Sequence, residues 1–326
     1  MPPASSAAPR LPQLRALQRA RGRRHRVNAL SFALCFPGQG SQTAGMADGL
    51  LETQIAQDML RVASDAGVDL EQALHGDADA LRPTEIAQPA LLLVECALHA
   101  SLPATLEVVA VAGHSVGEYA ACVAAQALAP ADAMTAVLAR GRAMAAMREG
   151  TMSAVIGLDA DAVEDVCAQV RSTGEVVVVA NLNAPGQVVI SGSRAGVDAA
   201  RALAAERGAR RAIELNVSGA FHSPLMGEAA QSFEPVLDAL PLRDPVVPVV
   251  CNVDAAPARA AATLRDRLRR QLTSAVRWVD TVHELTALGA TTLVEVGPGN
   301  VLTGLARRIS PDVAARAVNS VEAAQA

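Results

Sequence analysis

The chain has 326 residues, of which 51% are hydrophobic and 19% charged, a composition typical of a globular protein with one large or two modest domains. No uninterrupted apolar run reaches the roughly 18 to 20 residues of a membrane-spanning helix, so we expect no membrane association. All 28 basic residues are arginine, which excludes Schiff-base chemistry and a Walker-type phosphate loop, since both need a lysine.

Residues 1–30 are rich in arginine, alanine and proline and contain no acidic residue. We interpret them as a basic, disordered extension; the alternative is an organelle transit peptide. A basic extension on an acidic body is not the pattern of a nucleic-acid-binding fold, so no nucleic-acid partner is expected. The expected location is the cytoplasm, or an organelle if the extension is a transit peptide.

The first ordered stretch alternates predicted strands with predicted helices. Short apolar runs at 31–36 and 108–114 predict buried strands, and 88–100, 116–128 and 130–144 predict helices. This order favours a parallel α/β sheet covered by helices.

The texture changes between about 152 and 217, where strand-like and helical stretches follow one another in the order β-α-β-β-α-β. That order is typical of a small split-βαβ unit, which we interpret as an inserted subdomain over 152–218. Further strands are predicted at 245–253 and 291–296. The large domain then comprises 31–151 and 219–310, and 311–326 is expected to be a C-terminal tail.

The five cysteines are scattered and lack any C-x-x-C spacing, which argues against a disulfide framework or a zinc site. We expect them to be small buried hydrophobic residues, and we predict no metal site. They are Cys35, Cys96, Cys122, Cys167 and Cys251.

The sharpest local motif is Gly113-His114-Ser115-Val116-Gly117, which fits G-x-S-x-G between a predicted strand and a predicted helix. Small flanking residues permit a tight turn with the serine hydroxyl at its apex, and the helix directs free N–H groups towards it. The motif predicts that Ser115 is a nucleophile rather than a structural turn residue. His114 is expected to support the turn, since neighbouring side chains point to opposite faces.

A serine nucleophile needs a base, and His222 is the histidine whose setting suits that role. Ser223 is a possible N-cap and Pro224 a first-turn residue, so His222 precedes a helix on a fixed loop. A second tight loop, 36–42, places backbone N–H groups after a strand; it suits either an oxyanion hole or a plain turn.

Together these stretches resemble the malonyl-CoA:acyl-carrier-protein transacylase family, including the acyltransferase domains of polyketide synthases. The matches occur in family order over roughly 31–310. They are FPGQGSQ (36–42), QPALL (88–92), GHSVGEYAA (113–121), ARGRAM (139–144), NAPGQVVISG (183–192), FHSPLM (221–226), VRW (276–278) and EVGPGNVLTGL (295–305). The resemblance implies an α/β-hydrolase-like large domain with a ferredoxin-like insert.

The resemblance also implies a role for each matching residue. Ser115 is the acyl-accepting nucleophile and His222 the base. The backbone N–H groups of Gln39 and Val116 form the oxyanion hole, and Arg140 pairs with the malonyl carboxylate, for which a planar guanidinium is well suited.

Further positions follow from the same resemblance. The backbone carbonyl of Arg277 orients the histidine, and Asn183 and His114 lie close to the substrate. Phe221 crowds an α-methyl group, which favours malonyl over methylmalonyl. Asn300, which replaces a common lysine, is expected to cap the following helix.

The implied reaction is ping-pong transfer of a malonyl group from malonyl-CoA to an acyl carrier protein, for fatty acid or polyketide synthesis, by a monomer without a cofactor. Alternatives are an α/β-hydrolase-type esterase or thioesterase, a non-catalytic carrier-binding module, and a malonate-decarboxylase-type transacylase. Candidate docking residues for the carrier are arginines at 207, 210 and 211 and at 265, 267, 269 and 270; a plain solvated surface is the equal alternative.

Overall fold

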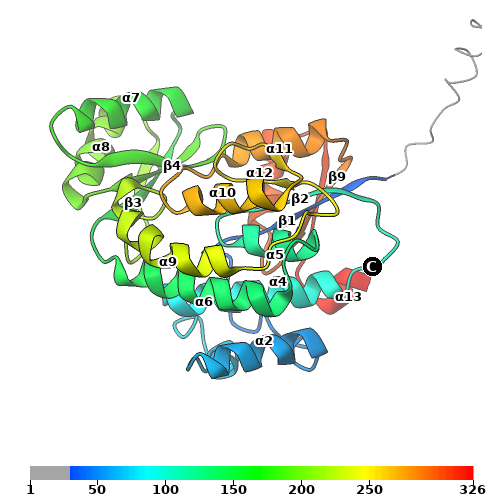
Figure 1. The fold of residues 1–326 in the computed structure, drawn as a ribbon. Helices are drawn as coiled ribbons and strands as arrows, with labels where there is room; N and C mark the ends of the chain where they lie inside the picture. Colours follow the sequence, from blue (N-terminus) through cyan, green and yellow to red (C-terminus); the bar gives the residue numbers. More distant parts are fainter. Residues whose placement is uncertain (1–29, 326) are drawn as a thin grey trace, which may run out of the picture. The chain divides into compact units, whose positions relative to one another are not determined.

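The computed structural model describes residues 30–325. The expectation of a disordered extension or transit peptide falls on residues 1–29, which lie outside that range. Within it, a large mixed α/β region and a separate small sheet follow from the alternation of apolar strands and amphipathic helices (Figure 1).

The large region is built on a six-stranded sheet with the order β10-β9-β1-β2-β7-β8. Neighbouring strands are parallel except for β7 and β8, which are antiparallel. The strands are β1 (Phe32–Phe36), β2 (Val108–Gly113), β7 (Val249–Val250), β8 (Pro257–Ala258), β9 (Thr292–Val296) and β10 (Ala314–Val318).

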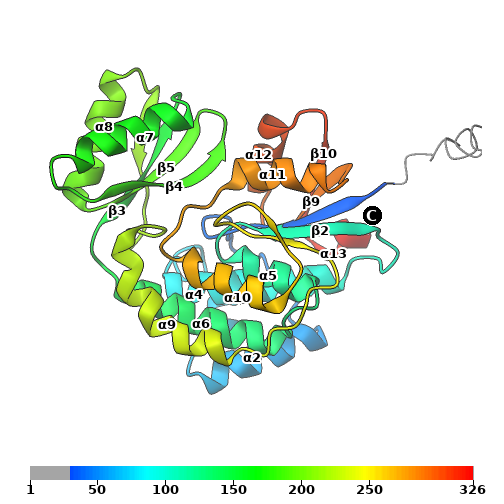
Figure 2. The same ribbon diagram turned by 45° about the horizontal axis from the view of Figure 1, so that its top comes forward.

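Helices cover both faces of this sheet, because successive side chains of β1 alternate between them (Figure 2). Leu34 and Phe36 pack in the cluster that includes α4 (Thr84–Ala100), α5 (Gly117–Ala124) and α6 (Pro130–Ala146). Ala33 and Cys35 pack on the other face against α11 (Trp278–Ala287) and α12 (Val301–Ile309). The remaining helices of this region are α2 (Gln54–Asp65), α3 (Leu70–His75), the 3-10 helix η1 (Pro224–Met226), α9 (Gly227–Ala239), α10 (Ala261–Gln271) and α13 (Val321–Gln325).

The small sheet is antiparallel, with the order β4-β5-β3-β6 and two helices packed on it. Its elements are β3 (Thr151–Ile156), α7 (Ala160–Arg171), β4 (Val177–Ala184), β5 (Gln187–Gly192), α8 (Arg194–Glu206) and β6 (Arg211–Glu214). The order β-α-β-β-α-β confirms the predicted split-βαβ unit. The large parallel sheet and this small unit together confirm the predicted fold class.

Three local predictions are wrong. The predicted tail, 311–326, is folded as far as residue 325, because β10 pairs with β9 along five residues and α13 follows. Of the predicted strand 245–253, Val249–Val250 alone form the strand that pairs with β2. The Pro248 carbonyl still accepts from the Val111 N–H at 3.0 Å, but Pro248 has no N–H to extend the ladder, and after Val250 the chain turns, with the Ala255 N–H donating to the Cys251 carbonyl at 2.9 Å. Asn300 makes no side-chain cap hydrogen bond to α12; instead the buried Glu295 carboxylate accepts from the N–H groups of Leu302 (2.9 Å) and Thr303 (2.7 Å).

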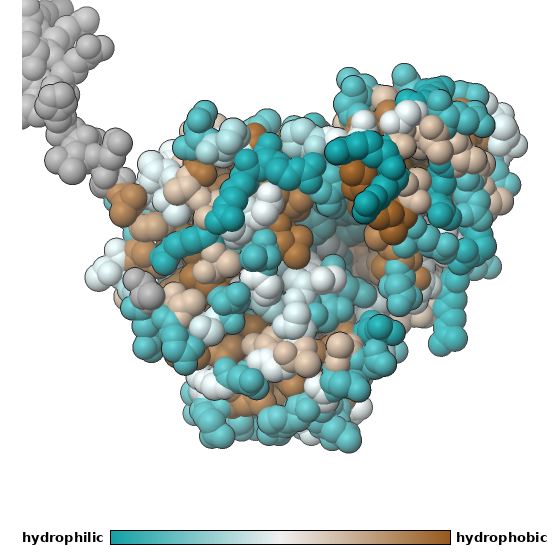
Figure 3. All heavy atoms as spheres, turned by 180° about the vertical axis from the view of Figure 1, so that it is seen from behind, coloured by the Kyte–Doolittle hydropathy of each residue, from teal (hydrophilic) through white to brown (hydrophobic). Residues whose placement is uncertain are grey.

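On the face opposite to that of Figure 1, hydrophilic residues are interspersed with scattered hydrophobic patches (Figure 3). Among the described residues, strongly exposed large hydrophobic side chains are Leu30, Ile213, Val246 and Val301. No helix in residues 30–325 is long and apolar enough to span a membrane.

Candidate active site

Two loops that carry predicted site residues meet because their strands are parallel neighbours. The carboxyl ends of β1 and β2 lie in register, with Phe36 opposite Gly113. The N–H of His114 donates to the Phe36 carbonyl at 2.8 Å, so pairing continues one residue into the turn. The 36–42 loop and the Ser115 turn therefore lie at the same edge of the sheet.

The turn around Ser115 is tight enough to require glycine on both sides. A Cβ on Gly113 would lie 1.9 Å from the carbonyl carbon of Gly117, and a Cβ on Gly117 would lie 2.3 Å from the Phe36 carbonyl oxygen. Ser115 itself has a φ of 53°, in the left-handed region that non-glycine residues rarely adopt. This is the strand–turn–helix geometry of a nucleophile elbow.

Asn252, just beyond β7, braces this turn from the neighbouring strand. Its Oδ1 accepts from the Ser115 N–H at 2.7 Å, and its Nδ2 donates to the Gly113 carbonyl at 2.6 Å. Asn252 is not among the residues predicted for the site from the sequence, where its only signal is its place directly after an apolar run.

Ser115 and His222 come together across 107 residues of sequence. The serine Oγ lies 2.8 Å from His222 Nε2. His222, which also has a positive φ of 56°, precedes η1, where Ser223 caps the first turn as predicted. Burial, together with the charge of Arg140, lowers the pKa of His222 to about 3, so the imidazole is neutral at neutral pH and able to accept a proton.

The prediction that the backbone carbonyl of Arg277 orients His222 is wrong. Its Nδ1 lies 3.1 Å from the carbonyl oxygens of Gln271 and Ser274, at the end of α10 and in the following loop. The Arg277 carbonyl instead accepts from Thr281 in the first turn of α11. The Arg277 side chain pairs with Asp280 on the surface.

Arg140 on α6 reaches the serine from below the turn. Its side chain is 1% exposed, and its Nη2 donates to Ser115 Oγ at 3.1 Å. The other acceptors are the amide oxygens of Gln88 (2.5 Å) and Gln271 (2.9 Å). In residues 30–325, Arg140 has no carboxylate within salt-bridge distance, so this buried cation is held by neutral groups.

These groups border a cavity of about 430 Å³. It is lined by eight of the nine residues that the sequence predicted for the site: Gln39, His114, Ser115, Val116, Arg140, Asn183, Phe221 and His222. Among the described residues, no hydrogen-bond acceptor is found for the backbone N–H of Gln39 or of Val116, whereas that of Ser115 is taken by Asn252. Two backbone donors are therefore free beside the serine.

His114 links the two sheets. Its Nε2 lies 2.9 Å from Asn183 Oδ1 on β4, and its ring packs 5.6 Å from the Trp278 ring. Burial lowers the pKa of His114. This contact places Asn183, from the small sheet, at the wall of the cavity.

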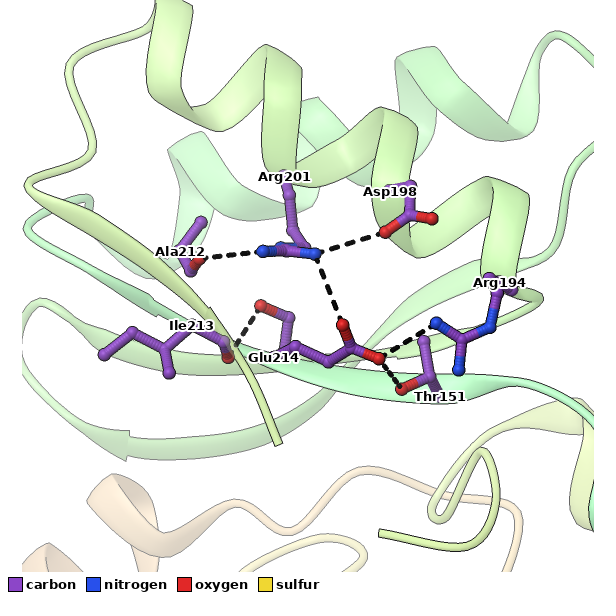
Figure 4. A network of polar contacts seen from close by, with 8 residues as sticks. Thr151, Arg194, Asp198, Arg201, Ala212, Ile213 and Glu214 are labelled. Carbon is purple, nitrogen blue, oxygen red and sulfur yellow. Dashed lines mark hydrogen bonds and ion pairs between the residues drawn. The ribbon is translucent and has the colours of Figure 1, made fainter. Parts of the chain in front are cut away.

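The small sheet also supplies the segment 215–217, which lines the cavity directly after β6. A polar network fixes the end of β6 against α8 (Figure 4). Glu214 accepts from Arg194 (2.9 Å) and Thr151 (3.3 Å), and Arg201 lies 3.7 Å away and bonds the Ala212 carbonyl. The hydrogen bond from Arg194 lowers the pKa of the Glu214 carboxyl.

Most candidate docking arginines on α10 are already occupied. Arg265 donates to the backbone carbonyls of Leu237, Asp238 and Leu240. Arg267 pairs with Asp254, and Arg269 pairs with Glu234 and Asp238. Their side chains hold α10 against its neighbours. Within residues 30–325, no group of three His, Cys, Asp or Glu side chains is placed to hold a metal ion.

The fold and the elbow define the class: an α/β protein with a serine–histidine pair suited to form an acyl ester on serine. Residues 34–319 match the family model described as an acyl transferase domain, and the chain belongs to that family.

Curated relatives and solved structures agree with this family. The malonyl CoA-acyl carrier protein transacylase of Bacillus subtilis is 43% identical over 300 residues, which cover 89% of this chain and 94% of the relative. Its counterpart in Escherichia coli K12 is 41% identical, covering 90% and 97%. The structure of the transacylase from Coxiella burnetii superposes with a TM-score of 0.86 at 36% identity, covering 92% and 98%. A malonyl-transacylase in complex with a type II polyketide synthase acyl-carrier protein gives 0.84 at 37%, covering 90% and 98%.

Proposed function

We propose that this protein transfers a malonyl group from malonyl-CoA to the phosphopantetheine thiol of an acyl carrier protein through an ester on Ser115. The observation that carries the proposal is the position of Arg140. This buried arginine has no carboxylate in contact with it among the described residues, and it donates to Ser115 Oγ, the same oxygen that lies beside His222 Nε2. A cation beside the nucleophile suits an acyl group that ends in a carboxylate. The names of the relatives, all malonyl transacylases, support the same donor and acceptor.

In the first half-reaction, neutral His222 takes the proton of Ser115 Oγ through the 2.8 Å contact while the oxygen attacks the thioester carbonyl. The carbonyls of Gln271 and Ser274 accept from Nδ1–H and stabilise the imidazolium that forms. The N–H groups of Gln39 and Val116 hold the oxyanion. His222 then returns the proton to the departing coenzyme A sulfur.

In the second half-reaction, the carrier thiol gives its proton to His222 and its sulfur attacks the serine ester. The same two N–H groups hold the oxyanion. When the intermediate collapses, Ser115 Oγ leaves and recovers the proton from His222, which restores the starting site. Throughout, Arg140 holds the malonyl carboxylate, and Phe221, which is buried at the cavity wall, limits the space for an α-substituent.

An esterase or thioesterase needs the serine, the base and the oxyanion donors, but not a buried guanidinium at the nucleophile. Arg140 therefore favours the transferase. Intact mass after incubation with malonyl-CoA tests the proposal: we expect a malonyl adduct that is lost with Ser115→Ala, is retained with the exposed control Ser232→Ala, and is discharged by carrier protein. Adduct formation on Ser115→Ala, or discharge only to water, would refute it.

We further propose that the protein acts as a monomer in the cytoplasm without a cofactor, and that residues 152–218 are a subdomain inserted into the catalytic domain. Every residue used in the reaction belongs to one chain, and serine ester chemistry is complete with these groups. The small antiparallel sheet lies between residues 151 and 214, which supports the insertion. Light scattering of the purified protein and fractionation of the native cells test these points.

A further inference from the structure

Glu118, in the first turn of α5, is a buried acidic residue that shares a hydrogen-bond partner, Gln271, with Arg140. Its side chain is 1% exposed, and its Oε2 accepts from Gln271 Nε2 at 2.5 Å. The proposed reaction gives Glu118 no task, although burying a carboxylate carries a large desolvation penalty unless a counter-charge offsets it. Its position behind the nucleophile therefore calls for a physical reason.

Gln271 joins the two charges through its amide. The amide oxygen accepts from Arg140 Nη2 at 2.9 Å, and the amide nitrogen donates to Glu118 and to the Ser115 carbonyl at 2.9 Å. The negative end of the amide dipole thus faces the cation and its positive end faces the carboxylate. Both charges favour this orientation, and reversal would set amide N–H groups against guanidinium N–H groups.

Glu118 is therefore the counter-charge of Arg140 while the acyl site is empty. A malonyl carboxylate that pairs with Arg140 adds a second negative charge to the same dry region. Two carboxylates around one cation repel each other at low dielectric. Protonation of the carboxylate farther from the cation, that of Glu118, removes this repulsion.

We propose that Glu118 balances Arg140 in the empty site and takes up a proton from solvent when the malonyl carboxylate binds, so that malonyl binding is coupled to proton uptake. This inference rests on the proposed function. Glu118 is a positioning residue in this scheme, since it acts on the substrate through Gln271 and Arg140.

Among the ionisable groups around it, Glu118 is the one that titrates near neutral pH. The ionisable groups around it are Arg140 on α6, Cys251 beyond β7, and Tyr119 and Cys122 on its own helix. Burial raises the pKa values of Tyr119 and of both thiols, so these groups stay neutral near neutral pH. Burial also raises the pKa of Glu118 to about 7, against the opposing effects of its hydrogen bond from Gln271 and the charge of Arg140.

The sign of the linkage follows. Malonyl binding neutralises Arg140 and adds a like charge, so it raises the pKa of Glu118 further and draws a proton onto it. Malonyl affinity then falls as pH rises above about 7, by at most tenfold per pH unit. Acetyl binding, which adds no charge, is not linked to this proton.

Calorimetry on the full chain carrying Ser115→Ala, which binds without turnover, tests the coupling. Malonyl-CoA and acetyl-CoA are titrated near pH 7.5 in phosphate and in Tris buffer, whose ionisation enthalpies differ. We expect net proton uptake for malonyl-CoA over acetyl-CoA, so that the shared coenzyme ionisations cancel. Glu118→Gln in the same background should abolish the difference, and the exposed control Glu228→Gln should preserve it.

Equal proton uptake for both ligands, or a malonyl-specific uptake that persists in Glu118→Gln, would overturn the inference. The first comparison needs no variant at Glu118, so it can overturn the inference even if that variant fails to fold. If wild-type protein forms the malonyl adduct but the Ser115→Ala protein shows no malonyl-specific uptake, only this inference fails. Failure to form the adduct at all refutes the proposed function instead.

Discussion

The malonyl specificity ascribed to Arg140 can be tested by removing its guanidinium. Arg140 is buried, and its partners among the described residues are neutral. A bound malonyl carboxylate would be the first anionic group in direct contact with the guanidinium. We therefore expect Arg140→Ala to impair malonyl transfer selectively and to leave acetyl transfer comparatively intact.

The magnitude follows from the two charge-assisted hydrogen bonds that a guanidinium gives a carboxylate. At about 1.5–3 kcal/mol each in a dry site, their loss costs about 3–6 kcal/mol. This corresponds to a decrease in kcat/KM for malonyl-CoA of roughly a hundredfold to ten-thousandfold. The decrease for acetyl-CoA should be within roughly tenfold, since the contact with Ser115 Oγ is the one bond of Arg140 that involves a reacting atom, and the bonds to Gln88 and Gln271 do not touch the acetyl group.

The assay is transfer of labelled malonyl or acetyl groups to a carrier protein under single-turnover conditions. The ratio of the two kcat/KM values removes any change in the fraction of folded enzyme. Arg142→Ala, two residues along the same helix with an exposed side chain, is the matched control and should leave the ratio unchanged. Equal losses for both acyl groups in Arg140→Ala would refute the assigned role.

Three further predictions concern the elbow, the base and a helix cap. Gly117→Ala should destabilise the protein by about 1–3 kcal/mol in urea unfolding, because the new Cβ would meet two backbone oxygens. Gly304→Ala, with open space around the new Cβ, should be neutral or stabilising. Equal effects of the two substitutions would contradict the steric argument. Acetyl loading in the first turnover should stay constant from about pH 8 to 5, because the pKa of His222 is lowered to about 3; an acid limb near the ordinary histidine pKa of about 6.5 would contradict the buried, neutral imidazole. Glu295→Ala should cost about 1–3 kcal/mol of unfolding free energy, because two N–H groups of α12 lose their acceptor, while Asn300→Ala should cost less than about 0.5 kcal/mol; the reverse order would restore Asn300 as the cap.

The sequence predicted features whose physics is local. The glycines around Ser115 and the apolar runs before it act within a few residues, and they identified the turn, its strand and its helix. His222 was recognisable because Ser223 and Pro224, which follow it directly, are residues typical of a helix start. The structure brings these two residues to hydrogen-bond distance.

Other features depend on partners that local patterns do not reveal. Every residue has a carbonyl, so no pattern could select Gln271 and Ser274 over Arg277 as partners of His222; the end of α10 decides it. Gln271 and Glu118 meet only once α10 packs beside α5. The strand β10 was missed because an edge strand of alternating exposed residues has little apolar signal.

Both members of the reacting pair, Ser115 and His222, hold left-handed backbone conformations. Each such conformation costs a non-glycine residue on the order of 1 kcal/mol or more, which the surrounding packing must offset. The substitution Ser115→Gly would relieve that strain, and the same substitution would remove the nucleophile. A library selected for thermal stability alone would therefore drift towards inactive protein at this position, and any stabilisation programme for this enzyme has to screen for acyl loading in parallel.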